Sequence, residues 1–110
     1  MSGRKHIETF KRDNELVDII FQHKGIENAI GTKELVIALN ERGWKVKIDG
    51  IHQIVSMITL ERRLPICAVV NKGYYWATSK QDILSCVAEL QSKVEALQIR
   101  CELLKSFICE

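Results

Sequence analysis

Four cysteines and three histidines are the residues with the widest chemistry here, because both types bind metals and take part in nucleophilic catalysis. No two cysteines have the CxxC spacing of a structural zinc site. No two histidines are four residues apart, the spacing that places two imidazoles on one helix face. We therefore expect free, mostly buried thiols, no bound metal, no cofactor and no catalytic residues. The residues concerned are Cys67, Cys86, Cys101, Cys109, His6, His23 and His52.

Composition sets the class of protein. The chain has 110 residues, of which 46% are apolar and 27% charged, as in one small globular domain. We find no nucleophile elbow, phosphate-binding glycine loop or paired carboxylates, so we expect no enzyme and no small-molecule ligand. There is no apolar run of the roughly 20 residues that span a bilayer, and no signal segment follows Met1, so we expect a cytoplasmic protein without a membrane partner.

The N-terminus is more basic than the rest of the chain. Residues 1–12 carry four basic side chains against one acidic side chain, whereas the net charge of the whole chain is only +2. We interpret residues 1–12 as a basic N-terminal arm, residues 13–78 as the folded domain and residues 79–110 as a separate interaction helix. Two interpretations of the arm stay open, a solubilising tail and a nucleic-acid contact.

Two helices are predicted before residue 44. The first begins at Asp13 or Asn14, which are good N-cap residues, and ends at Gly25. The second begins with Thr32 as N-cap and ends at Gly43. Apolar residues at helical spacing give each helix an inward face. These faces are Leu16, Val17, Ile20 and Phe21 in the first helix, and Leu35, Ala38 and Leu39 in the second.

A third helix follows an extended connection. Trp44, Val46 and Ile48 alternate with lysines, which predicts an extended segment with one buried side. Asp49 is the expected N-cap, and the helix has ended by Arg63 because Pro65 follows two residues later. The inward face is Ile51, Ile54, Val55 and Ile58, and the outward face is His52, Gln53, Ser56, Met57 and Thr59.

The stretch "ICAVVNKGYYWATS" at residues 66–79 predicts a β-hairpin. We expect a loop of Asn71, Lys72 and Gly73 that pairs Val69 with Tyr75. Both faces of the hairpin are apolar, so one must pack on the three helices and the other on the last helix. For the aromatic residues of the second strand, packing in the core and stacking on nucleobases both remain open.

The last helix carries a heptad seam. Ser79 is the expected N-cap with Asp82 three residues on, and no Gly or Pro interrupts residues 82–109. We expect a homodimer through this seam, in either orientation because its flanks carry no acidic residue. Packing of its first half on the chain's own domain, and capture of an acidic helix from another protein, remain open. The seam is Ile83, Val87, Leu90, Val94, Leu97, Cys101, Leu104 and Ile108, with the last six assigned to the dimer interface.

Three helices, a hairpin and a long helix, in this order, predict a mainly α fold, a winged helix-turn-helix followed by a C-terminal helix. "NAIGTKELVIAL" at residues 28–39 and "LPICAVVNKGYYWATS" at residues 64–79 resemble small phage and prophage winged-helix DNA-binding proteins. The resemblance implies a phage protein in the bacterial host cell that acts in transcription regulation or in assembling replication proteins on duplex DNA.

In this architecture the third helix enters the major groove and the wing tip meets the DNA backbone. The expected base contacts are therefore His52, Gln53 and Ser56, and the expected phosphate contacts are Lys33, Lys45, Lys47 and Lys72. Two alternatives stay open. The polar face of the third helix is a plain solvated face, or the protein is a winged-helix adaptor that binds a host protein without DNA.

Overall fold

Helices and one antiparallel hairpin make up the computed structural model, which describes the backbone of residues 2–108 and the side chains of residues 8–108. The fold is mainly helical, and a long helix ends it. The elements are α1 (Ser2–Phe21), the 3₁₀ turn η1 (Ile26–Asn28), α2 (Thr32–Glu41), α3 (Ile48–Arg62), β1 (Ile66–Val69), β2 (Gly73–Trp76) and α4 (Lys80–Ser106).

Helix α1 is longer at its start than the sequence predicts. Residues 2–12 are helical, so the predicted start at Asp13 or Asn14 is wrong. Asp13 does not cap a helix, because it lies inside α1, and its carboxylate accepts a hydrogen bond from the Arg12 guanidinium at 3.1 Å. Good helix formers such as Lys11 and Arg12 precede Asp13, so the helix continues through this residue instead of beginning at it.

Helix α1 also ends earlier than predicted, at Phe21 rather than Gly25. The backbone of residues 23–25 pairs with β2 instead. Trp76 donates its N–H to His23 O at 2.8 Å, and Gly25 donates to Trp76 O at 2.9 Å. These two bonds satisfy polar groups that the sheet edge would otherwise leave open.

The next two helices lie close to their predicted positions. Helix α2 has Gly31 as its N-cap and α3 has Lys47, each one or two residues before the predicted cap. The predicted end of α2 at Gly43 is confirmed by a Schellman motif, in which Trp44 N–H donates to Leu39 O at 3.1 Å. Ile48 is half-exposed, so its predicted burial is wrong, because it begins the helix instead of ending an extended segment.

The core lies between α1, α2, α3 and one face of the hairpin. The predicted inward stripes are largely confirmed, but Phe21 is 44% exposed and Ile19 and Val36 are buried in addition. The core residues are Leu16, Ile19, Ile20, Ile30, Leu35, Val36, Leu39, Ile51, Val55, Ile58, Ile66 and Tyr74, with Val17, Ala38, Trp44, Val46, Ile54, Leu64 and Trp76 packed at its edge.

The hairpin register differs from the predicted one by two residues. Cys67 pairs with Tyr75 and Val69 with Gly73, so the loop is Val70, Asn71 and Lys72. The reason is a third segment that the sequence does not mark as a strand. Ile30, just before α2, exchanges two backbone hydrogen bonds with Tyr74, both at 2.8 Å. This bridge fixes which residues of β2 stand beside the helices.

Both hairpin faces are covered, as predicted. Tyr74 faces the three-helix core, whereas Tyr75 is fully buried on the other face in a second cluster with Cys67 and Ala77. The first turns of α4 and the η1 turn close this second cluster, through Cys86 and Ile26. Burial of Tyr74 and Tyr75 assigns these rings to the core and not to base stacking.

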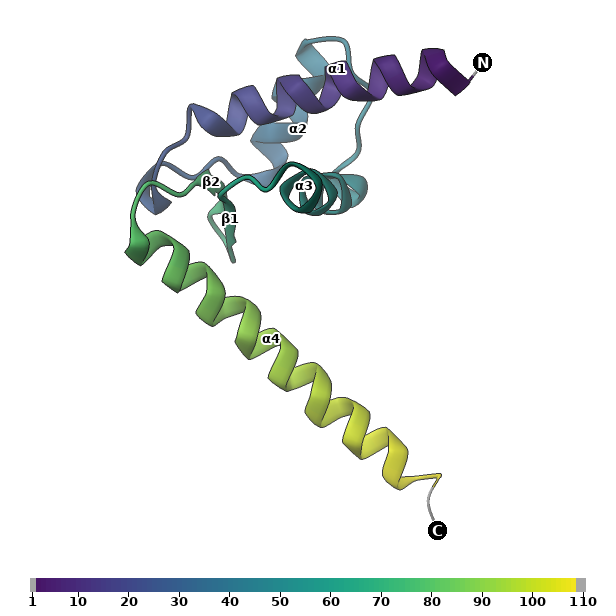
Figure 1. The fold of residues 1–110 in the computed structure, drawn as a ribbon, viewed down its shortest axis with the longest axis vertical. Coiled ribbons are helices and arrows are strands. Elements are labelled where there is room, and N and C mark those ends of the chain that lie inside the picture. Colours follow the sequence, from purple (N-terminus) through teal and green to yellow (C-terminus); the bar gives the residue numbers. More distant parts are fainter. Residues whose placement is uncertain (1, 109–110) are drawn as a thin grey trace.

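Helix α4 begins beside the hairpin and then runs away from the other elements as a rod (Figure 1). Its predicted cap is confirmed, because Asp82 N–H donates to Ser79 Oγ at 3.1 Å and the Asp82 carboxylate accepts from Thr78 N–H at 3.0 Å. Across the described residues, we find no helix with the length and apolar character that crossing a bilayer requires.

Candidate nucleic-acid interface

A depression of about 470 Å³ lies where the start of α2, the side of α3 and the hairpin loop meet. It brings together three of the seven residues predicted to contact DNA, from three different elements. Those three are Lys33, His52 and Lys72. Lys93 of α4, which the sequence places only on a flank of the seam, also lines it.

The bridge between Ile30 and Tyr74 is what places these residues together. It holds the hairpin against the segment that leads into α2, so Lys33 and Lys72 border the same depression. Gly73 makes the close approach possible. A Cβ at this position would lie 1.9 Å from Ile30 O, and the residue has a φ of 111°, which other residues rarely adopt.

His52 is held by the hairpin on one side. Its Nδ1 is hydrogen-bonded to the Tyr74 hydroxyl, and the two rings are 5.6 Å apart between centroids. Burial raises the pKa of Tyr74, so its phenol stays protonated at neutral pH. With Nδ1 engaged, Nε2 is the ring nitrogen of His52 left for an outside contact.

The depression is basic. The charged residues that line it are three lysines and one glutamate, Glu34. The Glu34 carboxylate folds back over the start of α2, because a Cβ at Gly31 would lie 2.1 Å from its Oε2. This carboxylate therefore lies at the positive end of the α2 helix dipole. The three lysines make the rest of the surface of the depression positively charged.

The other predicted DNA contacts lie elsewhere. Gln53 is exposed on α3, and Ser56 borders a second, apolar depression between α3, the hairpin and α4. Lys45 lies beside α1, in a depression shared with Glu8 and Arg12. Lys47 is exposed at the N-cap of α3. The structure thus brings three of the seven predicted DNA contacts together in one depression. The other four lie along α3, at its start and beside α1.

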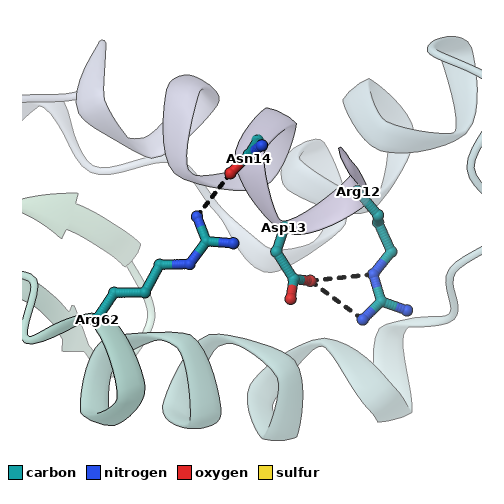
Figure 2. Close-up of polar contacts among 4 residues, drawn as sticks. All are labelled: Arg12, Asp13, Asn14 and Arg62. Atoms are coloured by element: carbon teal, nitrogen blue, oxygen red, sulfur yellow. Dashed lines mark hydrogen bonds and ion pairs between the residues drawn. The ribbon is translucent and has the colours of Figure 1, made fainter. Parts of the chain in front are cut away.

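Arg62 joins two helices. Its guanidinium, near the end of α3, donates to Asn14 Oδ1 of α1 at 2.8 Å (Figure 2). It also lies over the Phe10 ring, 5.1 Å from the centroid. The neighbouring Arg12 is engaged with Asp13 in the same view. We therefore assign Arg62 to the packing of α1 on α3.

The thiols differ in their surroundings. The prediction of free thiols is confirmed for the three described cysteines, but mostly buried thiols are not found. Cys67 is buried, Cys86 is partly buried and Cys101 is exposed, while Cys109 lies outside the described residues. Burial and the nearby Cys86 raise the pKa of Cys67 from 9.0 to about 12. Among the described residues, no group of three metal-binding side chains is present.

Cys67 is expected to resist alkylation. Because its pKa is raised, the reactive thiolate stays scarce as the pH rises from 8 toward 10, whereas exposed Cys101 is free to react. Iodoacetamide labelling of the native protein, diluted until it is monomeric and followed by peptide mass spectrometry, should modify Cys101 at least about tenfold faster than Cys67. In guanidinium chloride the two rates should converge. Equal rates in the native protein would contradict the burial described here.

Lys93 is the residue that sequence reasoning missed. It flanks the heptad seam, so the sequence assigns it to pairing of the helix. Its place beside the depression depends on how α4 leaves the hairpin, which is set by Ser79 and by packing of Cys86. The one local signal is that Lys93 lies seven residues after Cys86, on the same side of the helix.

Comparison with known proteins gives no relative: no protein-family profile, no curated protein and no solved structure matches this chain.

Proposed function

We propose that this chain is a phage-type winged-helix protein that binds duplex DNA as a homodimer, in transcription regulation or in assembling replication proteins on DNA. In this proposal α3 lies in the major groove and the β1–β2 hairpin is the wing, whose loop contacts the backbone. The observation that carries the proposal is the basic depression, in which Lys33, His52 and Lys72 meet from α2, α3 and the hairpin.

Phosphate contacts would supply most of the affinity. Lys33 and Lys72 are both exposed and line the same depression, which suits two phosphate contacts to one DNA strand. Each neutralised phosphate adds about −0.9 to the slope of log affinity against log salt. Lys45 and Lys47, exposed before α3, would contribute further contacts next to the same helix.

Base contacts would come from the exposed side of α3. Gln53 has a free amide that bonds adenine in bidentate fashion. His52 would offer only Nε2, because Tyr74 holds its other nitrogen. Ser56 lies one turn further along the helix and suits either kind of base. We assign no catalytic role to these residues.

Charge reversal at the depression tests the proposal. Lys33→Glu and Lys72→Glu are each expected to weaken binding to a mixed-sequence duplex at least about tenfold in 50 mM NaCl, and to lower the salt slope by about one. Fluorescence anisotropy of a labelled duplex, titrated at several salt concentrations, measures both quantities. Gln53→Ala should weaken a selected target more than random duplex.

Lys80→Glu is the matched control, since it makes the same charge change in the first turn of α4, where an acidic residue suits the helix dipole. It should bind duplex like the unchanged protein. No binding in low salt, or binding that does not depend on salt, would overturn the proposal.

The adaptor function is the second candidate. Met57 and Leu60 of α3 are 51% and 79% exposed, and exposed apolar side chains on the proposed reading helix suit contact with a protein better than contact with a DNA groove. If Leu60→Ser, Lys33→Glu and Lys72→Glu all leave DNA binding unchanged, α3 and the depression do not contact DNA. The adaptor function is then better supported than the DNA-binding function.

A further inference from the structure

Helix α4 contacts its own domain along one narrow stripe. Within Lys80–Ser106, the partly covered side chains are Asp82, Cys86 and Glu89, and Lys93 continues the same line beside the depressions. Tyr75 strengthens this attachment, because its hydroxyl donates to Asp82 O at 3.2 Å. The rest of the helix surface is exposed.

The heptad seam lies on a different side of α4. At about 100° per residue, its midline is roughly a quarter of a turn away from the attached stripe. Its apolar residues are therefore 40–81% exposed, and Cys101 is exposed with them. The domain is attached mainly through the stripe, and of the seam residues Leu90 alone also borders the apolar depression between α3, the hairpin and α4, so most of the seam is available to a second chain.

The identity of the seam residues fits a second copy of the same helix. In the repeat, the a positions are Val87, Val94, Cys101 and Ile108, and the d positions are Ile83, Leu90, Leu97 and Leu104. Within parallel coiled coils, β-branched residues at a with leucine at d favour two strands over three or four. A second copy of α4 presents the same pattern, so the two helices match layer by layer.

The seam together with its flanks approaches the area that a specific pair buries. Covering its exposed apolar side chains removes on the order of 800 Å² from water in the pair, taking about 60–120 Å² for each full side chain. The stems of the flanking side chains bring the total toward the roughly 1,200 Å² at which specific interfaces begin.

We propose that α4 pairs in parallel and in register with α4 of a second copy, so that the Cys101 side chains of the two chains face each other across the axis. This inference rests on the homodimer of the proposed function, but not on contact with DNA. Both domains then lie at the same end of the rod, where two α3 helices can approach one duplex. Hydrogen peroxide would join the chains: the two thiols form the S–S bond, the O–O bond breaks, and the thiol protons leave in two water molecules.

The flanks give the pair an unusual salt dependence. In a parallel pair Arg100 at a g position faces Lys105 at an e position of the other helix, and like charges weaken the pair. Salt screens this repulsion. Dimerisation should therefore strengthen severalfold between 50 and 500 mM NaCl, which is opposite to the salt dependence of DNA binding.

Cross-linking of the full chain without DNA tests the proposal. After treatment with hydrogen peroxide, non-reducing electrophoresis should show a covalent dimer that is lost in Cys101→Ser and retained in Cys109→Ser. Sedimentation should show that Leu97→Asp makes the protein monomeric, while Ile99→Asp, on the outer side of the helix, keeps the dimer. Circular dichroism of both variants checks that the domain stays folded.

Each outcome decides the matter. A dimer that does not cross-link through Cys101 overturns the parallel arrangement, and a monomeric unchanged protein overturns the pairing. A Cys101-linked dimer that binds no DNA supports the pairing and overturns only the proposed DNA function.

Discussion

Gly73→Ala is expected to destabilise the domain by about 4 kcal/mol or more, among the largest costs seen for single substitutions. Two effects combine at this residue. Its φ of 111° strains any residue with a Cβ, and that Cβ would lie 1.9 Å from Ile30 O and 2.7 Å from Gly31 Cα. Both neighbours are backbone atoms, so no side-chain rotation relieves the clash. The bridge between Ile30 and Tyr74 should break, and the melting temperature should fall by about 15 °C.

Gly43→Ala separates the two effects. Gly43 has a φ of 93°, but a Cβ there meets no atom within 4 Å. This variant should therefore show only the conformational cost, about 1–2 kcal/mol. Thermal unfolding followed by circular dichroism, at one protein concentration for all samples, measures both variants. Equal losses for the two variants would mean that the approach of Ile30 to Gly73 is not as close as described.

Tyr75→Ala has the second largest expected effect. The ring is fully buried in the cluster that joins the hairpin to α4, and truncation of a large buried aromatic residue costs about 3–5 kcal/mol. The loss should be local as well as global, because the first turns of α4 lose the surface on which they pack. Urea unfolding should give the free energy, and amide hydrogen exchange should show faster exchange over residues 82–90.

Tyr75→Phe is the matched control for packing. It keeps the ring and removes only the hydroxyl that donates to Asp82 O, a bond worth about 0.5–1.5 kcal/mol. If Tyr75→Phe were as unstable as Tyr75→Ala, the hydrogen bond and not the ring would hold α4. If neither variant changed the urea midpoint, α4 would not be attached through this cluster.

Sequence patterns correctly predicted the features that depend on interactions between residues close in the chain. The inward stripe of α3, the Ser79 cap and the end of α2 at Gly43 follow from helical spacing and capping chemistry, and the structure confirms each of them. The start of α1 did not follow, because a good cap residue inside a run of helix formers is an ambiguous signal. Cap rules state where a helix can begin, not where it must.

Long-range contacts decided the rest. The hairpin register depends on Ile30, which lies more than 40 residues before Tyr74 and carries no strand pattern around it. For the candidate site, Lys33, His52 and Lys72 were identified by their expected elements, whereas Lys93 required knowledge of how α4 is attached. Side-chain bonds such as Tyr74 with His52 lie beyond any pattern in the sequence.

Helix α4 packs on the domain through one set of residues and presents its seam through another. Folding of the domain and the choice of a pairing partner therefore depend on different residues. Changes along the seam leave the buried tyrosines and the helix caps untouched. In the proposed dimer, a few substitutions there would create a variant that no longer pairs with the unchanged protein, or one that forms mixed pairs with it. In the proposed dimer, two domains with different α3 surfaces would then be combined on one rod by mutation of the seam, with the domain core unchanged.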